Sequence, residues 1–318
     1  MNDDLVKKTN AKVRETANLT EILNELRDAQ SGNKARQNII REIEDLEKTK
    51  LVLYIESIGN PKSGINHGDA VPLGNILDNI GDVDNVDLLI QSGGGDGNAA
   101  EKIIEMCRAC CKKRFRVIVP NMAKSAATLI TFGSDEIIMG YLSELGPIDA
   151  QIPIRVSGQV QFISAQSFID GRDELVKMVN EAREKNEDPL PYLQQLSTID
   201  VAFVNHCQKL MDFAVDMGIK WLSKFMLKNE ANAEEKAEST ANTLRSVSKY
   251  LLHGRMINAD ELLKNPDIYL NVKKLEKEDA LWKLIWELYV RCEIYLNLAD
   301  GGQKVKLIES AERSITVG

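Results

Sequence analysis

Short apolar runs alternate with helical patterns in the first half of the chain. Four of these runs each predict a strand: LVLYIESI (51–58), VDLLI (86–90), FRVIV (115–119) and DEIIMG (135–140). Nearly continuous apolar composition is typical of strands that are buried on both faces of a sheet. Helices are predicted between the later strands, at about 98–112 and 123–132. This alternation predicts right-handed crossovers in a largely parallel sheet, and therefore an α/β core over residues 51–165.

The two ends of the chain have mainly helical periodicity. Residues 1–50 are polar and predict a helical hairpin, broken at SGNK (31–34), that packs on the core or on a second subunit. Residues 159–164 predict an edge strand, and residues 166–318 predict a helical extension for packing and oligomerisation. The last helix has an unusually wide apolar face, which includes Trp282 and Trp286. Such a face indicates burial on two sides, within the fold or in an oligomer.

A glycine cluster and a serine follow two successive strands of the predicted core. SGGGDGNAA (92–100) comes directly after the strand at 86–90, and MAKSAATLI (122–130) comes after the strand at 115–119. Glycines at a strand end can leave backbone N–H groups pointing at an anion, and a serine at a helix start lies at the positive end of that helix. A serine nucleophile beside an oxyanion hole needs these parts. We therefore expect Ser125 as nucleophile, with Gly94, Gly95 and Ala126 supplying the oxyanion hole.

Two other interpretations of these segments are weaker. The glycine cluster has no GK[ST] ending and no clean G-x-G-x-x-G pattern, and the next strand runs into Pro120–Asn121 rather than an acidic residue. Nucleotide binding is therefore disfavoured. Ser125 taken alone would be an ordinary N-cap, and only the adjacent glycine cluster favours the catalytic interpretation.

Composition narrows the class of protein further. The formal net charge of −8 disfavours nucleic acid or an anionic membrane as the main partner. No apolar run has the length of a membrane span, and the first residues lack a secretory signal, so a cytoplasmic protein is expected. Cys107, Cys110 and Cys111 lack a second Cys or His pair at zinc-site spacing and are interpreted as reduced core residues. No metal or organic cofactor is expected.

The order of these motifs resembles the Clp-fold serine peptidases, a superfamily that includes ClpP-type proteases and signal peptide peptidase A and shares its fold with crotonases. The serine dehydrogenase proteinases resemble the chain most, through SGGG (92–95), AKSAAT (123–128) and LGPIDAQ (145–151). The resemblance covers residues 51–165 well and the rest loosely. It implies a ClpP/crotonase-like core of ββα units, peptide or protein substrates, and a ring or stacked homo-oligomer, with a regulatory partner as a further possibility.

The general base is the part of the site that the sequence leaves open. ClpP-type enzymes have a histidine after the serine helix, but this chain has none between His67 and His206, and Asp149 stands there instead. His253 can reach a site from a helix end, with Asp149 orienting it as third member of a triad. Lys177 is the alternative by analogy with signal-peptide-peptidase-type enzymes.

Two further functions remain open at this point. One is a catalytically inactive Clp-fold scaffold that oligomerises and binds peptides or a partner protein. The other is a crotonase-like acyl-CoA enzyme that uses the same oxyanion hole without a nucleophile. The favoured prediction is a cytoplasmic serine peptidase that acts through an acyl-enzyme on Ser125.

Overall fold

The central element of the molecule is a mostly parallel sheet. A computed structural model describes residues 16–25, 29–60, 62–246, 253–298 and 304–318. The strand order in its seven-stranded sheet is β10-β5-β3-β2-β1-β11-β12. These strands are β1 (Lys50–Glu56), β2 (Val83–Gln91), β3 (Cys111–Val119), β5 (Glu136–Met139), β10 (Val272–Lys274), β11 (Lys306–Glu309) and β12 (Ser314–Val317). All neighbours from β10 to β1 pair in parallel, whereas β11 pairs antiparallel with β1 and with β12.

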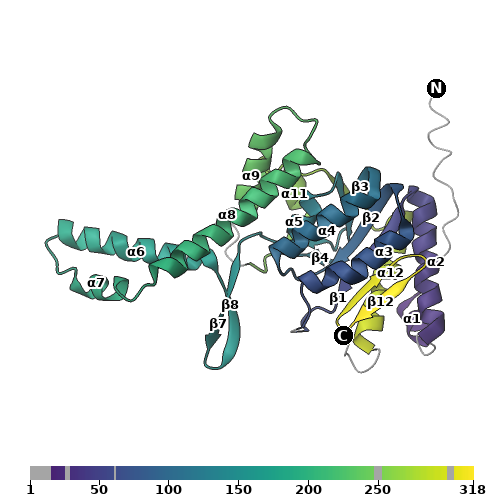
Figure 1. The fold of residues 1–318 in the computed structure, drawn as a ribbon, viewed down its shortest axis with the longest axis horizontal. Helices are drawn as coiled ribbons and strands as arrows, with labels where there is room; N and C mark the ends of the chain where they lie inside the picture. The colour runs from purple at the N-terminus through teal and green to yellow at the C-terminus, as the bar shows by residue number, and fades with distance from the viewer. Residues whose placement is uncertain (1–15, 26–28, 61, 247–252, 299–303) are drawn as a thin grey trace.

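Helices cover both faces of this sheet (Figure 1). The helices are α1 (Leu19–Glu25), α2 (Ala29–Glu47), η2 (His67–Asp69), α3 (Ala70–Ile80), α4 (Gly97–Cys110), α5 (Ala126–Phe132), α6 (Ala165–Glu184), α7 (Leu190–Leu196), α8 (Val201–Lys224), α9 (Ala233–Arg245), α11 (Ala259–Lys264) and α12 (Ala280–Leu298). Alternate residues of β1 point to opposite faces. Val52 and Tyr54 pack with α3, α4 and α5, while Leu51 and Leu53 pack with α2 and α12. The strand is thus buried on both sides, as its apolar run predicts.

In the described part of the chain, two small sheets lie outside the main one. The first has the order β4-β6-β9 and consists of β4 (Met122–Ala123), β6 (Glu144–Leu145) and β9 (Ile257–Asn258). The second is a hairpin of β7 (Gln151–Val156) and β8 (Gln159–Ser164). The first sheet brings the segment before α5, the segment after β5 and the segment around residue 257 together.

An arm made of the β7–β8 hairpin, α6, α7 and the first half of α8 projects from the core (Figure 1). It has a small apolar cluster of its own, which includes Ile169, Val204 and Met211. Several large apolar side chains of the arm are exposed, among them Phe162 at 67% and Val201 at 64%. None of the helices described in the structure is long and apolar enough to cross a bilayer.

The predicted fold class, an α/β core around a largely parallel sheet, is confirmed. The structure also adds strands that the pattern did not predict. β10, β11 and β12 come from the range 166–318 and join the central sheet, although that range has mainly helical periodicity. At the other end, α2 begins at Ala29 and continues through SGNK, so the expected break at residues 31–34 is wrong. A single glycine, Gly32, did not end this helix, because the helix packs Ile39, Ile40 and Ile43 into the core.

A buried cross-strand ion pair in the sheet gives a test of the core. Asp87 on β2 faces Arg116 on β3, Nε of Arg116 lies 2.9 Å from Oδ1, and both side chains are at most 2% exposed. Asp87→Ala would leave the buried arginine charge with only the partly exposed Glu47 and Glu136 as described partners, so we expect a loss of about 3 kcal/mol in the free energy of unfolding. Asp84→Ala removes an exposed pair with Lys113 on the same two strands and should cost less than about 1 kcal/mol. Urea denaturation measures the free energy of unfolding of both variants. Equal losses in Asp87→Ala and Asp84→Ala would contradict the prediction.

Candidate active site

The glycine turn and Ser125 lie side by side because their strands are neighbours in the sheet. Ser92 forms a bridge with Ala123: its N–H donates to the Met122 carbonyl at 3.1 Å, and its carbonyl accepts from the Lys124 N–H at 3.0 Å. A Cβ placed on Gly94 would be 2.8 Å from Cβ of Ser125. Gly94 also has φ of 105°, a conformation that side chains rarely adopt. Glycine at this position therefore permits the close approach of the turn to the serine.

Ser125 has an unusual backbone conformation for its residue type. It precedes α5 with φ of 51° and ψ of −116°, and its hydroxyl makes no capping hydrogen bond to the helix. Such sparsely populated conformations cost about 1–3 kcal/mol and cluster at functional sites. The N-cap interpretation of Ser125 lacks the hydrogen bond on which it depends. The side chain is partly exposed and lines a pocket instead.

The backbone N–H groups expected to form an oxyanion hole are not equivalent. The Gly94 N–H donates to Oγ of Ser92 at 3.0 Å and is therefore engaged within the turn. Within the described part of the chain, the N–H groups of Gly95 and Ala126 make no hydrogen bond. The first N–H groups of a helix have no partner within the helix, which explains Ala126. Of the three expected donors, Gly95 and Ala126 are the two left for a ligand.

Asp149 and His253 are brought together although 104 residues separate them in the chain. Nδ1 of His253 lies 2.7 Å from Oδ1 of Asp149, and the second carboxylate oxygen accepts from Nε2 of Gln151 at 2.8 Å. Asp149 is 1% exposed, whereas the imidazole is 24% exposed. A carboxylate at Nδ1 favours the tautomer with its proton there, which leaves Nε2 of the neutral ring able to accept a proton.

One pocket of about 650 Å³ contains these groups together. Ser125, Ala126, Gly93–Gly95 and His253 all line it. One side of the remaining wall is apolar and comes from α5, the segment before β7, β8 and α8: Leu129, Ile148, Ala150, Phe162, Leu210, Phe213 and Ala214. The other lining residues include the polar Glu56, Ser63, Asp96, Asn98 and Gln151. The arrangement can hold an extended apolar chain against a serine, a histidine and two free N–H groups.

Lys177, the alternative base, and Lys124, the neighbour of the serine in the chain, are both absent from the pocket wall. Lys177 is 75% exposed on α6, where its Nζ is 3.7 Å from Glu181, and it is not part of the pocket wall. Lys124 points away from the serine: its Nζ lies 2.8 Å from Glu144 and donates to the carbonyls of Leu145 and Arg255. Burial lowers the pKa of Lys124. The structure thus brings His253, and neither lysine, to the pocket of Ser125.

The other two histidines lie outside the pocket, and two further residues near the site were not predicted from the sequence. His206 falls on a stripe of α8 that is apolar in the sequence, but its side chain is exposed, and the neighbouring Cys207 is buried instead. His67 begins the short helix η2 and is exposed as well. Gln151 and Glu56 were not predicted. The first could have been found from its place in LGPIDAQ, two residues after Asp149.

Part of the sequence matches a known protein family and two related proteins. Residues 21–160 match the model of a family described as ClpP-like SDH-type serine proteinase. Two uncharacterized proteins of Methanocaldococcus jannaschii, MJ0137 and MJ1495, are 42% and 39% identical over 67 residues, which is 21% of this chain. The match spans 23% of the length of each of these relatives.

Among solved structures, two variants of one protease are similar. The protease is the 1510-N membrane-bound stomatin-specific protease, once as a serine-to-alanine mutant and once as a lysine-to-alanine mutant in complex with a substrate peptide. Each is 14% identical with a TM-score of 0.28, and the comparisons cover 71% and 76% of this chain and 98% of the other.

Proposed function

We propose that this chain is a serine peptidase whose nucleophile is Ser125, starting from the match of residues 21–160 to the ClpP-like SDH-type serine proteinases. The observation that carries the proposal is the Asp149–His253 hydrogen bond, because it orients a histidine in the same pocket as the serine. An oriented base beside a hydroxyl is what activates a serine for attack on a carbonyl.

The reaction would proceed by acylation and deacylation. Oγ of Ser125 attacks the carbonyl carbon of the scissile bond while Nε2 of His253 takes its proton, and Asp149 stabilises the imidazolium that forms. The negative charge on the carbonyl oxygen is stabilised by the N–H groups of Gly95 and Ala126. The imidazolium then gives its proton to the leaving amine, which departs and leaves an ester on Ser125. Water activated by the same histidine hydrolyses this ester and regenerates the hydroxyl.

The apolar wall of the pocket supports peptides as substrates. Leu129, Phe213 and Ala214 can cover an apolar side chain next to the scissile bond, and β8 adds Phe162 on another side. The acyl-CoA and scaffold alternatives need no activated nucleophile, whereas a serine peptidase needs both the serine and the oriented histidine that share this pocket.

Labelling with a fluorophosphonate probe tests the proposal directly. Such probes react with serines that a neighbouring base has activated, so we expect one adduct per chain by intact mass, located on Ser125 by peptide mapping. Ser134, a buried serine beyond the end of α5, should not be labelled. A folded protein that takes up no probe, or takes it up at a serine other than Ser125, would overturn the peptidase proposal and favour the scaffold or the acyl-CoA enzyme.

A further inference from the structure

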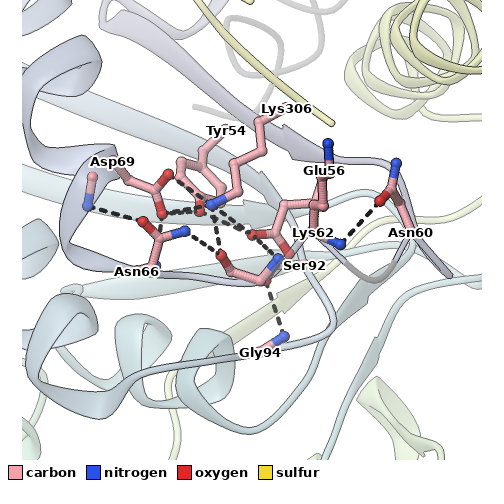
Figure 2. A network of polar contacts seen from close by, with 11 residues as sticks. Tyr54, Glu56, Asn60, Lys62, Asn66, Asp69, Ser92, Gly94 and Lys306 are labelled. Carbon is pink, nitrogen blue, oxygen red and sulfur yellow. Dashed lines mark hydrogen bonds and ion pairs between the residues drawn. The ribbon is translucent and has the colours of Figure 1, made fainter. Parts of the chain in front are cut away.

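A buried network of polar side chains lies directly behind the glycine turn (Figure 2). Tyr54 and Glu56 come from β1, Asp69 from η2, Ser92 from the end of β2 and Lys306 from β11. All five are at most 2% exposed. Burying charged groups costs several kcal/mol for each ion unless they are paired and hydrogen-bonded. Such a cluster therefore needs an explanation beyond the packing of the core.

One carboxyl group joins the two loops that line the pocket. Oε2 of Glu56 accepts from the Ser92 hydroxyl at 2.6 Å, and the Ser92 oxygen in turn accepts from the Gly94 N–H at 3.0 Å. Oε1 of Glu56 accepts from the Gly64 N–H at 3.1 Å. Gly64 and Gly94 both line the pocket of Ser125. Glu56 therefore holds the conformation of both loops through hydrogen bonds to their backbone.

Lys306 supplies the positive charge of the network. Its Nζ lies 2.7 and 2.8 Å from the two oxygens of Asp69, donates to the Gly64 carbonyl at 2.6 Å, and lies 3.7 Å from Oε1 of Glu56. Asp69 also accepts from the Asn66 N–H at 2.8 Å. These contacts make Asp69 the ionised partner of the lysine.

The hydroxyl of Tyr54 shows where a further proton must lie. This oxygen is 2.9 Å from Oε1 of Glu56 and 2.7 Å from Oδ2 of Asp69, but it has only one proton to donate. For both contacts to be hydrogen bonds, one of the two carboxyl groups must carry a proton and donate it to the tyrosine oxygen. Asp69 forms the ion pair with Lys306, so we place this proton on Glu56. Burial raises the pKa of Glu56, although the Ser92 hydrogen bond and Lys306 oppose this shift. The network is then neutral, and Glu56 itself adds no full negative charge behind the glycine turn.

We propose that Lys306, Asp69, Tyr54, neutral Glu56 and Ser92 form a positioning network that holds the glycine turn in the conformation needed for oxyanion stabilisation. None of these five side chains takes part in the chemistry. By engaging the Gly94 N–H, Ser92 fixes the turn so that the next N–H, that of Gly95, remains for the substrate oxygen. The inference rests on the proposed peptidase function for its catalytic consequence, but the network itself can be measured without activity.

Ser92→Ala is the variant that separates the turn from the network. It removes the hydroxyl that joins Glu56 to Gly94 and so lets the Gly95 N–H move out of place. We expect kcat for a fluorogenic peptide to fall about 10- to 100-fold and KM to change less than about 3-fold, because this N–H stabilises mainly the transition state. Ser143→Ala is a matched control, because Ser143 is also a buried serine that accepts a glycine N–H (Gly140) and donates to a carbonyl, outside the pocket. We expect its kcat within about 3-fold of the original chain.

A second readout is independent of activity. Hydrogen–deuterium exchange should increase at least about 10-fold at the Gly94 amide in Ser92→Ala and stay unchanged there in Ser143→Ala. Glu56→Gln, which keeps the neutral state, should retain slow exchange, whereas Glu56→Ala should lose it. If the starting protein shows no hydrolysis or labelling but the exchange pattern holds, the peptidase proposal fails and the network stands. Equal exchange and equal kcat in Ser92→Ala and Ser143→Ala would overturn the network.

Discussion

Replacing Ser125 by alanine is expected to lower kcat for peptide hydrolysis by about 10⁶-fold, which is the order of loss when a serine nucleophile is removed from an intact triad. The residual rate comes from the oxyanion donors and from binding, which the substitution leaves in place. KM should change little, because the pocket wall of Leu129, Phe213 and Ala214 is unaltered. The measurement is the initial rate with a fluorogenic peptide that has an apolar residue before the scissile bond.

The control for this variant is Ser134→Ala. Ser134 is a fully buried serine whose hydroxyl donates to the Thr131 carbonyl at 2.7 Å, and it lies outside the pocket. It should keep its kcat within about 3-fold. Hydrolysis by Ser125→Ala at the rate of the original chain would mean that the activity belongs to another group or to a contaminant.

His253→Gln and Asp149→Asn are each expected to reduce kcat by roughly 10⁴-fold. Glutamine cannot take the serine proton, and asparagine holds the imidazole in the wrong tautomer while leaving its position nearly unchanged. The two losses should not add in the double variant, because the aspartate acts only through the histidine. Initial rates of the two single variants and the double variant test both statements.

The chain contains three histidines, which provides matched controls for the base. His206→Gln and His67→Gln change exposed residues outside the pocket wall and should leave kcat within about 2-fold. Lys177→Ala should do the same, since Lys177 contacts Glu181 on the surface of α6. A large loss in Lys177→Ala together with full activity in His253→Gln would assign the base to the lysine.

The core strands were predictable because burial on both faces leaves a direct signal in the sequence. LVLYIESI, VDLLI and FRVIV fall on β1, β2 and β3, since strands within a covered parallel sheet have such nearly uninterrupted apolar runs. β11 and β12 were not predicted. Each of these strands has only four residues. β11 pairs with β1, which lies far away in the chain: Leu53 of β1 is opposite Glu309 of β11. Periodicity in a local window carries no information on such a pairing.

The candidate site was predictable to different depths. The sequence placed Ser125 and the glycine turn after two successive strands. Adjacent parallel strands end at the same edge of a sheet, so the two segments could be expected to lie side by side. The pair of Asp149 and His253 was only one of the candidates for the general base. The sequence pattern of a helix does not show which loop lies next to the end of that helix. The use of the Gly94 N–H by Ser92 depends on a side-chain rotamer, so no spacing in the sequence could have excluded Gly94 as an oxyanion donor.

The position of Lys306 in the chain also sets an order of events during synthesis. Asp69 and Lys306 are 237 residues apart, so the lysine leaves the ribosome long after the β1–β2 region that it neutralises. At elongation rates of about 5–20 residues per second, the delay is roughly 10 to 50 s. Until then the acidic groups beneath the glycine turn have no lysine to pair with, and the turn lacks its complete support. If the chain has the peptidase function proposed above, its site would therefore stay incomplete until late in synthesis.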